Sequence, residues 1–198
     1  MTIDESAGPI TLFEVHDLYA RTLGPMLIEA CARWGEPAQA QEALQALHTR
    51  AAAGDRIAAT DWAAALEPAL RQIYRHAYPY AQAYAAAATD ASSYAAAHGY
   101  TAAEARQFGD TYADMNTAAN ARVHAEANAA ANAAATAAAF ATGDPHAYAA
   151  TYPSARLRAA VLACAGGDAA RSQSIWNQLG TELPAVLAQS LTPSADHH

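Results

Sequence analysis

Residues 101–143 read TAAEARQFGDTYADMNTAANARVHAEANAAANAAATAAAFATG, and they contain the clearest helix signals of the chain. Thr101 and Glu104 form a capping box, in which a threonine and a glutamate three residues later satisfy the first N–H groups of a helix. Gly143 is the residue type that most often ends a helix. Because no proline interrupts the alanine-rich run between them, the stretch predicts a single helix of about 41 residues, roughly 60 Å long.

Similar signals divide the rest of the chain into helices. A capping box at Thr11 and Glu14 begins a helix that runs to about Trp34, with a break or bend at Gly24–Pro25. Further helices are expected to begin at Pro37, Thr60, Asp144, Pro153, Asp168 and Thr181. No stretch shows the alternation that a strand requires. We therefore predict an all-α fold, an antiparallel helical bundle with a long Ala-rich helical hairpin.

The composition of the middle of the chain predicts that hairpin. The chain contains 60 alanines, and residues 74–156 include no leucine or isoleucine, only Val123 as a larger aliphatic residue, and nine of the ten tyrosines. The helix that begins at Thr60 can continue to His98, kinked or split by Pro79, and then turn back into the long helix. Alanine at the contact would let the two helices approach closely.

Leucine and isoleucine are concentrated on both sides of the hairpin segment, which favours one domain with a conventional helical core. The expected parts are a flexible N-terminus (1–10), Leu-rich helices (11–60), the hairpin (61–142), short helices packing on the N-terminal helices (143–191) and a flexible C-terminus (192–198).

Charge and composition restrict the partners and the compartment. The formal net charge is −8 and no basic stripe exists, which argues against a nucleic-acid partner. No stretch of 18 residues is apolar enough to span a bilayer, and the acidic N-terminus does not resemble an export signal. Cys31 and Cys164 lie far apart within helical patterns, as expected for buried free thiols. We therefore expect a cytoplasmic protein with no nucleic-acid or membrane partner.

Motifs for metals and cofactors are missing from the sequence. All 11 basic residues are arginine, so Schiff-base chemistry on a lysine is excluded. The metal-binding spacings His-Glu-x-x-His and Glu-x-x-His, the phosphate-binding loops GxxxxGK[ST] and GxGxxG, and the serine nucleophile elbow do not occur. We expect no metal and no cofactor.

Helical periodicity places one carboxylate among apolar residues of the long helix. The residues that share one arc at 100° per residue, which we predict to be the buried face, are Phe108, Tyr112, Met115, Ala119, Val123, Glu126, Ala130, Ala133, Ala137 and Phe140. If the hairpin turns at Gly99–Tyr100, Glu126 lies opposite position 74, within reach of His76 and Tyr80. A carboxylate, an imidazole and a phenol can act as an acid–base set, so these three are the candidate catalytic residues. The alternative is a buried salt bridge between Glu126 and Arg122, with His76 at the surface.

A second row on the long helix has a polar residue at every fourth position: Asn116, Asn120, His124, Asn128, Asn132 and Thr136. Uncharged amides in a row can face another helix, a second copy of the chain or a polar ligand, or they can form a solvated face. The candidate binding residues are Tyr84, Tyr112, Asn116, Asn120, Arg122, His124 and Asn128.

Two functions from different classes remain open. The first is a helical binding or interaction protein without catalytic activity, which acts through its hairpin on a protein partner or as a homodimer. The second is a small enzyme or a protein that sequesters a small polar or aromatic molecule, with its Glu/His/Tyr pocket at the Pro79 kink. An exposed apolar or amide face favours the first function, and a concave pocket with converging polar groups favours the second.

Overall fold

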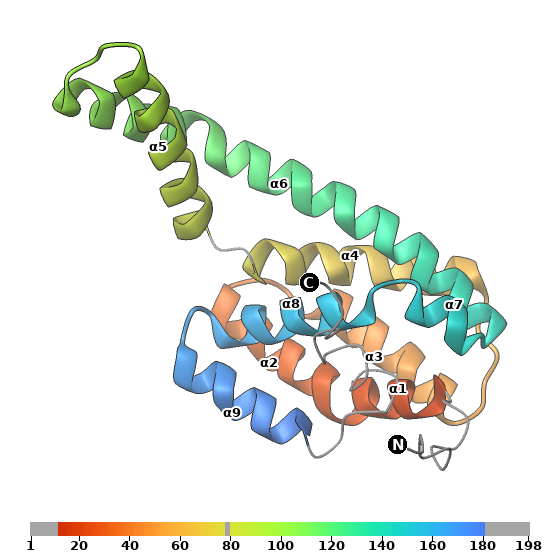
Figure 1. Ribbon diagram of the computed structural model, residues 1–198. Coiled ribbons are helices and arrows are strands. Elements are labelled where there is room, and N and C mark those ends of the chain that lie inside the picture. Colours follow the sequence, from red (N-terminus) through yellow and green to blue (C-terminus); the bar gives the residue numbers. More distant parts are fainter. Residues whose placement is uncertain (1–11, 78–79, 181–198) are drawn as a thin grey trace, which may run out of the picture.

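The computed structural model describes residues 12–77 and 80–180, with all side chains in these ranges except those of residues 80–83, 117–122 and 124. Every regular element in these two ranges is a helix and no strand occurs there, so the predicted all-α fold is confirmed. Figure 1 shows a body, built from helices of both ends of the described chain, and a projection in which α5 (Tyr80–Ala97) lies beside the first part of α6 (Ala102–Thr142). We call α5 and residues 102–123 of α6 the arm.

The first helix is continuous but changes its winding in the middle. The segment η1 (Tyr19–Leu23) is π-helical and joins α1 (Leu12–Leu18) to α2 (Gly24–Trp34). Pro25 has no N–H for the carbonyl of residue 21, whereas the N–H of Gly24 bonds to the carbonyl of Tyr19, five residues earlier. The break predicted at Gly24–Pro25 is therefore a wide turn within an unbroken helix. The capping threonine Thr11 lies outside the described residues.

The body packs helices that are distant in sequence around a conventional core. The second half of α6 lies on α4 (Ala59–Ala77), and α3 (Gln39–Ala52) also packs on α4. After α7 (Pro145–Ala149), α8 (Pro153–Ala165) packs on α4 and α2, and α9 (Ala169–Gly180) packs on α8. The largest fully buried side chains include Trp62, Leu27, Leu44 and Leu179. The helix expected from Thr181 lies outside the described residues.

The long helix is as the sequence predicts. Helix α6 has 41 residues, and both hydrogen bonds of the capping box between Thr101 and Glu104 are present. Gly143 ends the helix in the left-handed conformation, with φ of 65°. Before it, α4 ends at Ala77 and α5 begins at Tyr80, and Pro79, where a kink or split was predicted, lies outside the described residues.

The buried face of α6 differs from the predicted one. Ala133, Ala137 and Phe140 are buried as expected, but most of the large residues on the predicted arc are exposed: Phe108, Tyr112, Met115 and Val123. The buried positions recur instead at every fourth residue: Ala105, Gly109, Ala113, Ala125, Ala129, Ala133 and Ala137. A row with this spacing turns about 40° around the helix at each step, so α5 and α4 contact faces of α6 that are roughly 120° apart. A single stripe at a fixed angle cannot describe such a contact.

Close approach of the two helices of the arm explains why the row consists of small residues. Gly109 lies against α5, and a Cβ atom at this position would collide with the carbonyl oxygen of Ala88 and the side chain of Ser92. Phenylalanine and tyrosine cannot enter a contact between backbones at this separation. The large side chains of the arm therefore lie outside the contact, and the small ones lie within it.

Leucine substitutions at two positions of α6, three residues apart, test this corrected face. Ala133 is 2% exposed within the core, so Ala133→Leu should lower the free energy of unfolding by about 1–3 kcal/mol through overpacking. Ala130 is exposed, and Ala130→Leu should be nearly neutral. Urea titration of both variants measures the difference, and equal losses would show that the assigned face is wrong.

Candidate functional sites

The contact between α4 and α6 has a different register from the predicted one. The amide Nδ2 of Asn132 donates to the hydroxyl of Tyr74 at 3.0 Å, so position 74 lies opposite position 132 rather than 126. The prediction counted residues through one continuous helix, whereas the structure has two helices, α4 and α5. Glu126 is half-buried and has an interaction partner, and the His76 imidazole contacts Glu36.

His76 belongs to a different cluster, at the junction of α2 and α4. Its Nε2 lies 3.0 Å from Oε1 of Glu36, and its ring stacks on Trp34 with a centroid distance of 4.3 Å. Arg75 and Gln72 also donate to the Glu36 carboxylate, at 2.9 and 3.1 Å. Burial alone would raise the pKa of Glu36, but the hydrogen bonds from His76 and Gln72 and the charge of Arg75 lower it overall. The side chains of this cluster contact one another, and these contacts hold the end of α2 against α4.

The structure describes only some of the remaining candidate residues. Tyr84 donates to the carbonyl oxygen of Asp110 at 3.3 Å, and Asn116 donates to the carbonyl of Tyr112 in its own helix at 2.9 Å. Asn128 is half-buried and has a partner. The side chains of Tyr80, Asn120, Arg122 and His124 lie outside the described residues.

The polar row on α6 passes from the surface of the arm into the body. Asn116 is half-buried, Asn132 contacts Tyr74 on α4, and Thr136 is 1% exposed. The polar row therefore runs along α6 beside the row of small residues. At Asn132 it faces another helix, which is one of the interpretations that the sequence left open.

The exposed surface of the arm carries a continuous apolar stripe. Phe108, Tyr112, Met115 and Val123 follow helical spacing on one side of α6, and Met115 and Val123 are 70% and 65% exposed. Tyr100 adds its ring at 6.2 Å from that of Phe108. We call the four α6 residues the arm stripe. These four residues belong to the arc that the sequence predicts to be buried, but their side chains are exposed to solvent.

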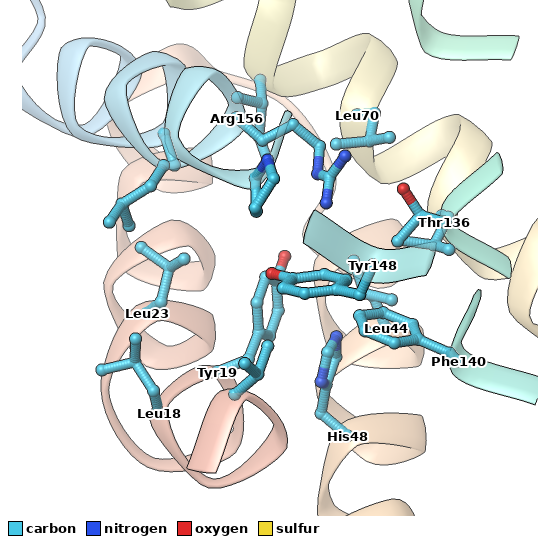
Figure 2. Close-up of a pocket in the computed structure, with 16 residues that line it drawn as sticks. Leu18, Tyr19, Leu23, Leu44, His48, Leu70, Thr136, Phe140, Tyr148 and Arg156 are labelled. Carbon is cyan, nitrogen blue, oxygen red and sulfur yellow. The ribbon is translucent and has the colours of Figure 1, made fainter. Parts of the chain in front are cut away.

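A second candidate site is a cavity of about 60 Å³ inside the body, shown in Figure 2. It lies between the first helix, α3, α4, the end of α6 and α8. Most of its lining is aliphatic: Val15, Leu18, Leu23, Leu44, Leu66, Leu70, Ile73 and Leu157. Such a lining suits the hydrocarbon part of a ligand.

Five polar side chains, each from a different helical segment, also face this cavity: Tyr19, His48, Thr136, Tyr148 and Arg156. The ring of Tyr19 stacks on His48 at 4.2 Å, and the guanidinium of Arg156 lies 5.5 Å from the centre of the Tyr148 ring. Figure 2 shows the hydroxyls of Tyr19 and Tyr148 close to each other, beneath the guanidinium of Arg156. Burial raises the pKa of both tyrosines, and the positive charge of Arg156 opposes this rise.

Two histidines are buried at the cavity: His48 lines it, and His16 lies beside His48. Nδ1 of His16 lies 3.0 Å from Nδ1 of His48, and the pair packs among Trp62 and Phe140. Burial lowers the pKa of His16 to about 4, and burial followed by the charges of His16 and Arg156 lowers the pKa of His48 well below its usual value. The spacing of Gln41, Leu44 and His48 on one face of α3 was the available signal.

Comparison with family models, curated protein sequences and solved structures finds no match to this chain. Within residues 12–77 and 80–180, no group of three or more His, Cys, Asp or Glu side chains is placed to hold a metal ion. None of the helices in the same ranges has both the length and the apolar character needed to cross a bilayer. The arm stripe and the body cavity are therefore the features from which a function can be argued.

Proposed function

We propose that this all-α protein is an interaction protein without catalytic activity, that it acts through its arm, and that the partner of the arm is a second copy of the chain. The observation that carries this proposal is the arm stripe. Apolar side chains that recur at helical spacing on an exposed face are typical of a surface that another helix covers.

A second copy is the partner that best fits the chemistry of the stripe. Around a two-fold axis, the same patch of each subunit meets itself, so an uncharged patch is self-complementary. Asp110 and Asp114 project from other sides of α6 at 100° per residue, away from the line through Phe108 and Met115. The arm also extends beyond the body, which leaves its outer face accessible to another arm (Figure 1).

We place this interaction in the cytoplasm. Cys31 and Cys164 are buried free thiols, as expected in a reducing compartment. Burial raises the pKa of both, that of Cys164 to about 12, so neither is held as a reactive thiolate.

The enzyme alternative has weaker support. It requires His76 to act with Glu126, but the imidazole of His76 is bound to Glu36 and stacked on Trp34. Because the His76 imidazole is engaged by Glu36 and Trp34, it is not available to a substrate at the junction of α4 and α5.

Self-association through the arm is tested by charge substitutions within the stripe. We expect the full chain to dimerise, and Phe108→Glu combined with Met115→Glu to weaken the dimer at least tenfold, because each dimer interface would then contain four facing carboxylates. The matched control is Leu162→Glu, since Leu162 is an exposed apolar residue of the body, 46% accessible. Sedimentation velocity over a concentration series measures the equilibrium. A wild-type chain that stays monomeric, or a dimer that Leu162→Glu weakens as much as the arm variant does, would contradict the proposal.

A further inference from the structure

The hydroxyl of Thr136 is the most unusual polar group in the body. Its side chain is 1% exposed, it lines the cavity, and its Oγ1 has no hydrogen-bond partner. A buried hydroxyl without a partner destabilises the folded protein, and a threonine in a helix can usually avoid this cost by bonding to its own backbone. Figure 2 shows this hydroxyl pointing toward the space beside Arg156.

Arg156 faces the same space with an incompletely used set of donors. Its two terminal nitrogens donate to the carbonyl oxygen and the hydroxyl of Thr151, the latter at 2.9 Å. A guanidinium has five N–H groups, and no carboxylate of the described chain pairs with this one. The lining of the cavity includes no Asp or Glu. Among the described residues, the site therefore has a positive charge and hydroxyl donors but no anion.

We propose that this cavity binds a short-chain monocarboxylate, with its carboxylate held by Arg156 and the hydroxyls of Thr136 and Tyr148, and its hydrocarbon tail among the leucines. An arginine recognises a carboxylate through paired N–H donors, and hydroxyls complete its hydrogen bonding. The aliphatic lining excludes a polar remainder such as a sugar or a nucleoside.

The size of the cavity limits the ligand. A water molecule needs about 10–15 Å³ of such space, so 60 Å³ accommodates about four to six non-hydrogen atoms. Butanoate has this size, whereas octanoate exceeds it. This site is in the body and is independent of the arm, so the ligand proposal and the proposed self-association can each fail without the other.

Calorimetric titration of the full chain with butanoate tests the site. We expect saturable binding, with at least tenfold weaker binding of 1-butanol, which lacks the carboxylate, and of octanoate, which is too long. Arg156→Gln should weaken butanoate binding at least tenfold, while Arg158→Gln, the same change on the exposed side of α8, should leave the affinity unchanged. No saturable binding, equal binding of butanoate and 1-butanol, or equal losses in the two arginine variants would overturn the proposal.

Thr136→Val gives an independent test that does not depend on the folding of the arginine variant. Valine keeps the shape and removes the unpaired hydroxyl, so the melting temperature of the unliganded protein should rise by roughly 2–4 °C, while the affinity for butanoate should fall about tenfold. A lower melting temperature with unchanged affinity would show that the hydroxyl is satisfied within the protein, and would overturn the assignment.

Discussion

Replacing Gly109 by alanine is expected to destabilise the arm, although alanine is the better helix former. At an open helical site, glycine to alanine stabilises by up to about 1 kcal/mol. At Gly109 the added methyl group would collide with a backbone oxygen of α5, which cannot rotate away, so we expect a loss of about 1–3 kcal/mol. Gly109→Leu should cost more, because the larger side chain must separate the helices.

The matched control for this prediction is Gly180→Ala. Gly180 is also helical, and a Cβ atom there would have no neighbour within 4 Å, so the variant should be neutral or slightly more stable. Hydrogen exchange of the α5 amides reports the arm directly, and urea titration reports the whole chain. Stabilisation by Gly109→Ala would mean that α5 and α6 are not in close contact at this point.

Acidification is expected to destabilise the body before the carboxylates titrate. His16 and His48 are neutral in the folded chain, and both have a pKa below the usual value of 6.5. Below pH 6.5 the unfolded chain therefore binds protons that the folded chain does not, and stability falls as the pH falls toward about 4. At pH 5 the loss is about 2 kcal/mol for His16, and His48 adds to it in the same direction.

Urea titrations between pH 7.5 and 5 measure this loss. The double variant His16→Leu with His48→Leu should have a nearly flat profile over this range, because it removes both buried imidazoles together and leaves neither unpaired. His146→Gln, which changes an exposed histidine, should keep the wild-type slope. If the wild-type chain is equally stable at pH 7 and pH 5, the histidines are charged in the folded state and their assigned environment is wrong.

Features of this fold that depend on residues near each other in sequence could be predicted, whereas those that depend on contacts between distant helices could not. The capping box at Thr101 and the stop at Gly143 are local backbone effects, and the sequence predicts both. The buried face of α6 depends on how closely another helix approaches, and there the large side chains misled a prediction based on hydrophobicity. The presence of small residues at every fourth position, from Ala105 to Ala137, was the signal that would have corrected it.

The candidate sites were harder to predict because they combine distant segments. Tyr19, His48, Thr136 and Arg156 come from four separate helices, and no spacing in the sequence relates them. The arithmetic that paired Glu126 with position 74 assumed one uninterrupted helix before the turn. In the structure, Tyr74 lies opposite Asn132, six residues from the position that this arithmetic gave.

The π-helical turn at Tyr19–Leu23 changes the angle about the helix axis between the buried residues of α1 and those of α2. On a regular α-helix, the buried residues of α1 and those of α2 would point in directions roughly 100° apart. Five residues wound more loosely remove most of that difference, so His16 and Leu27 can face the same interior. The side of α1 that faces the core, including His16, thus depends on the number of residues in this turn. Deleting one residue there would turn a different side of α1 toward the core.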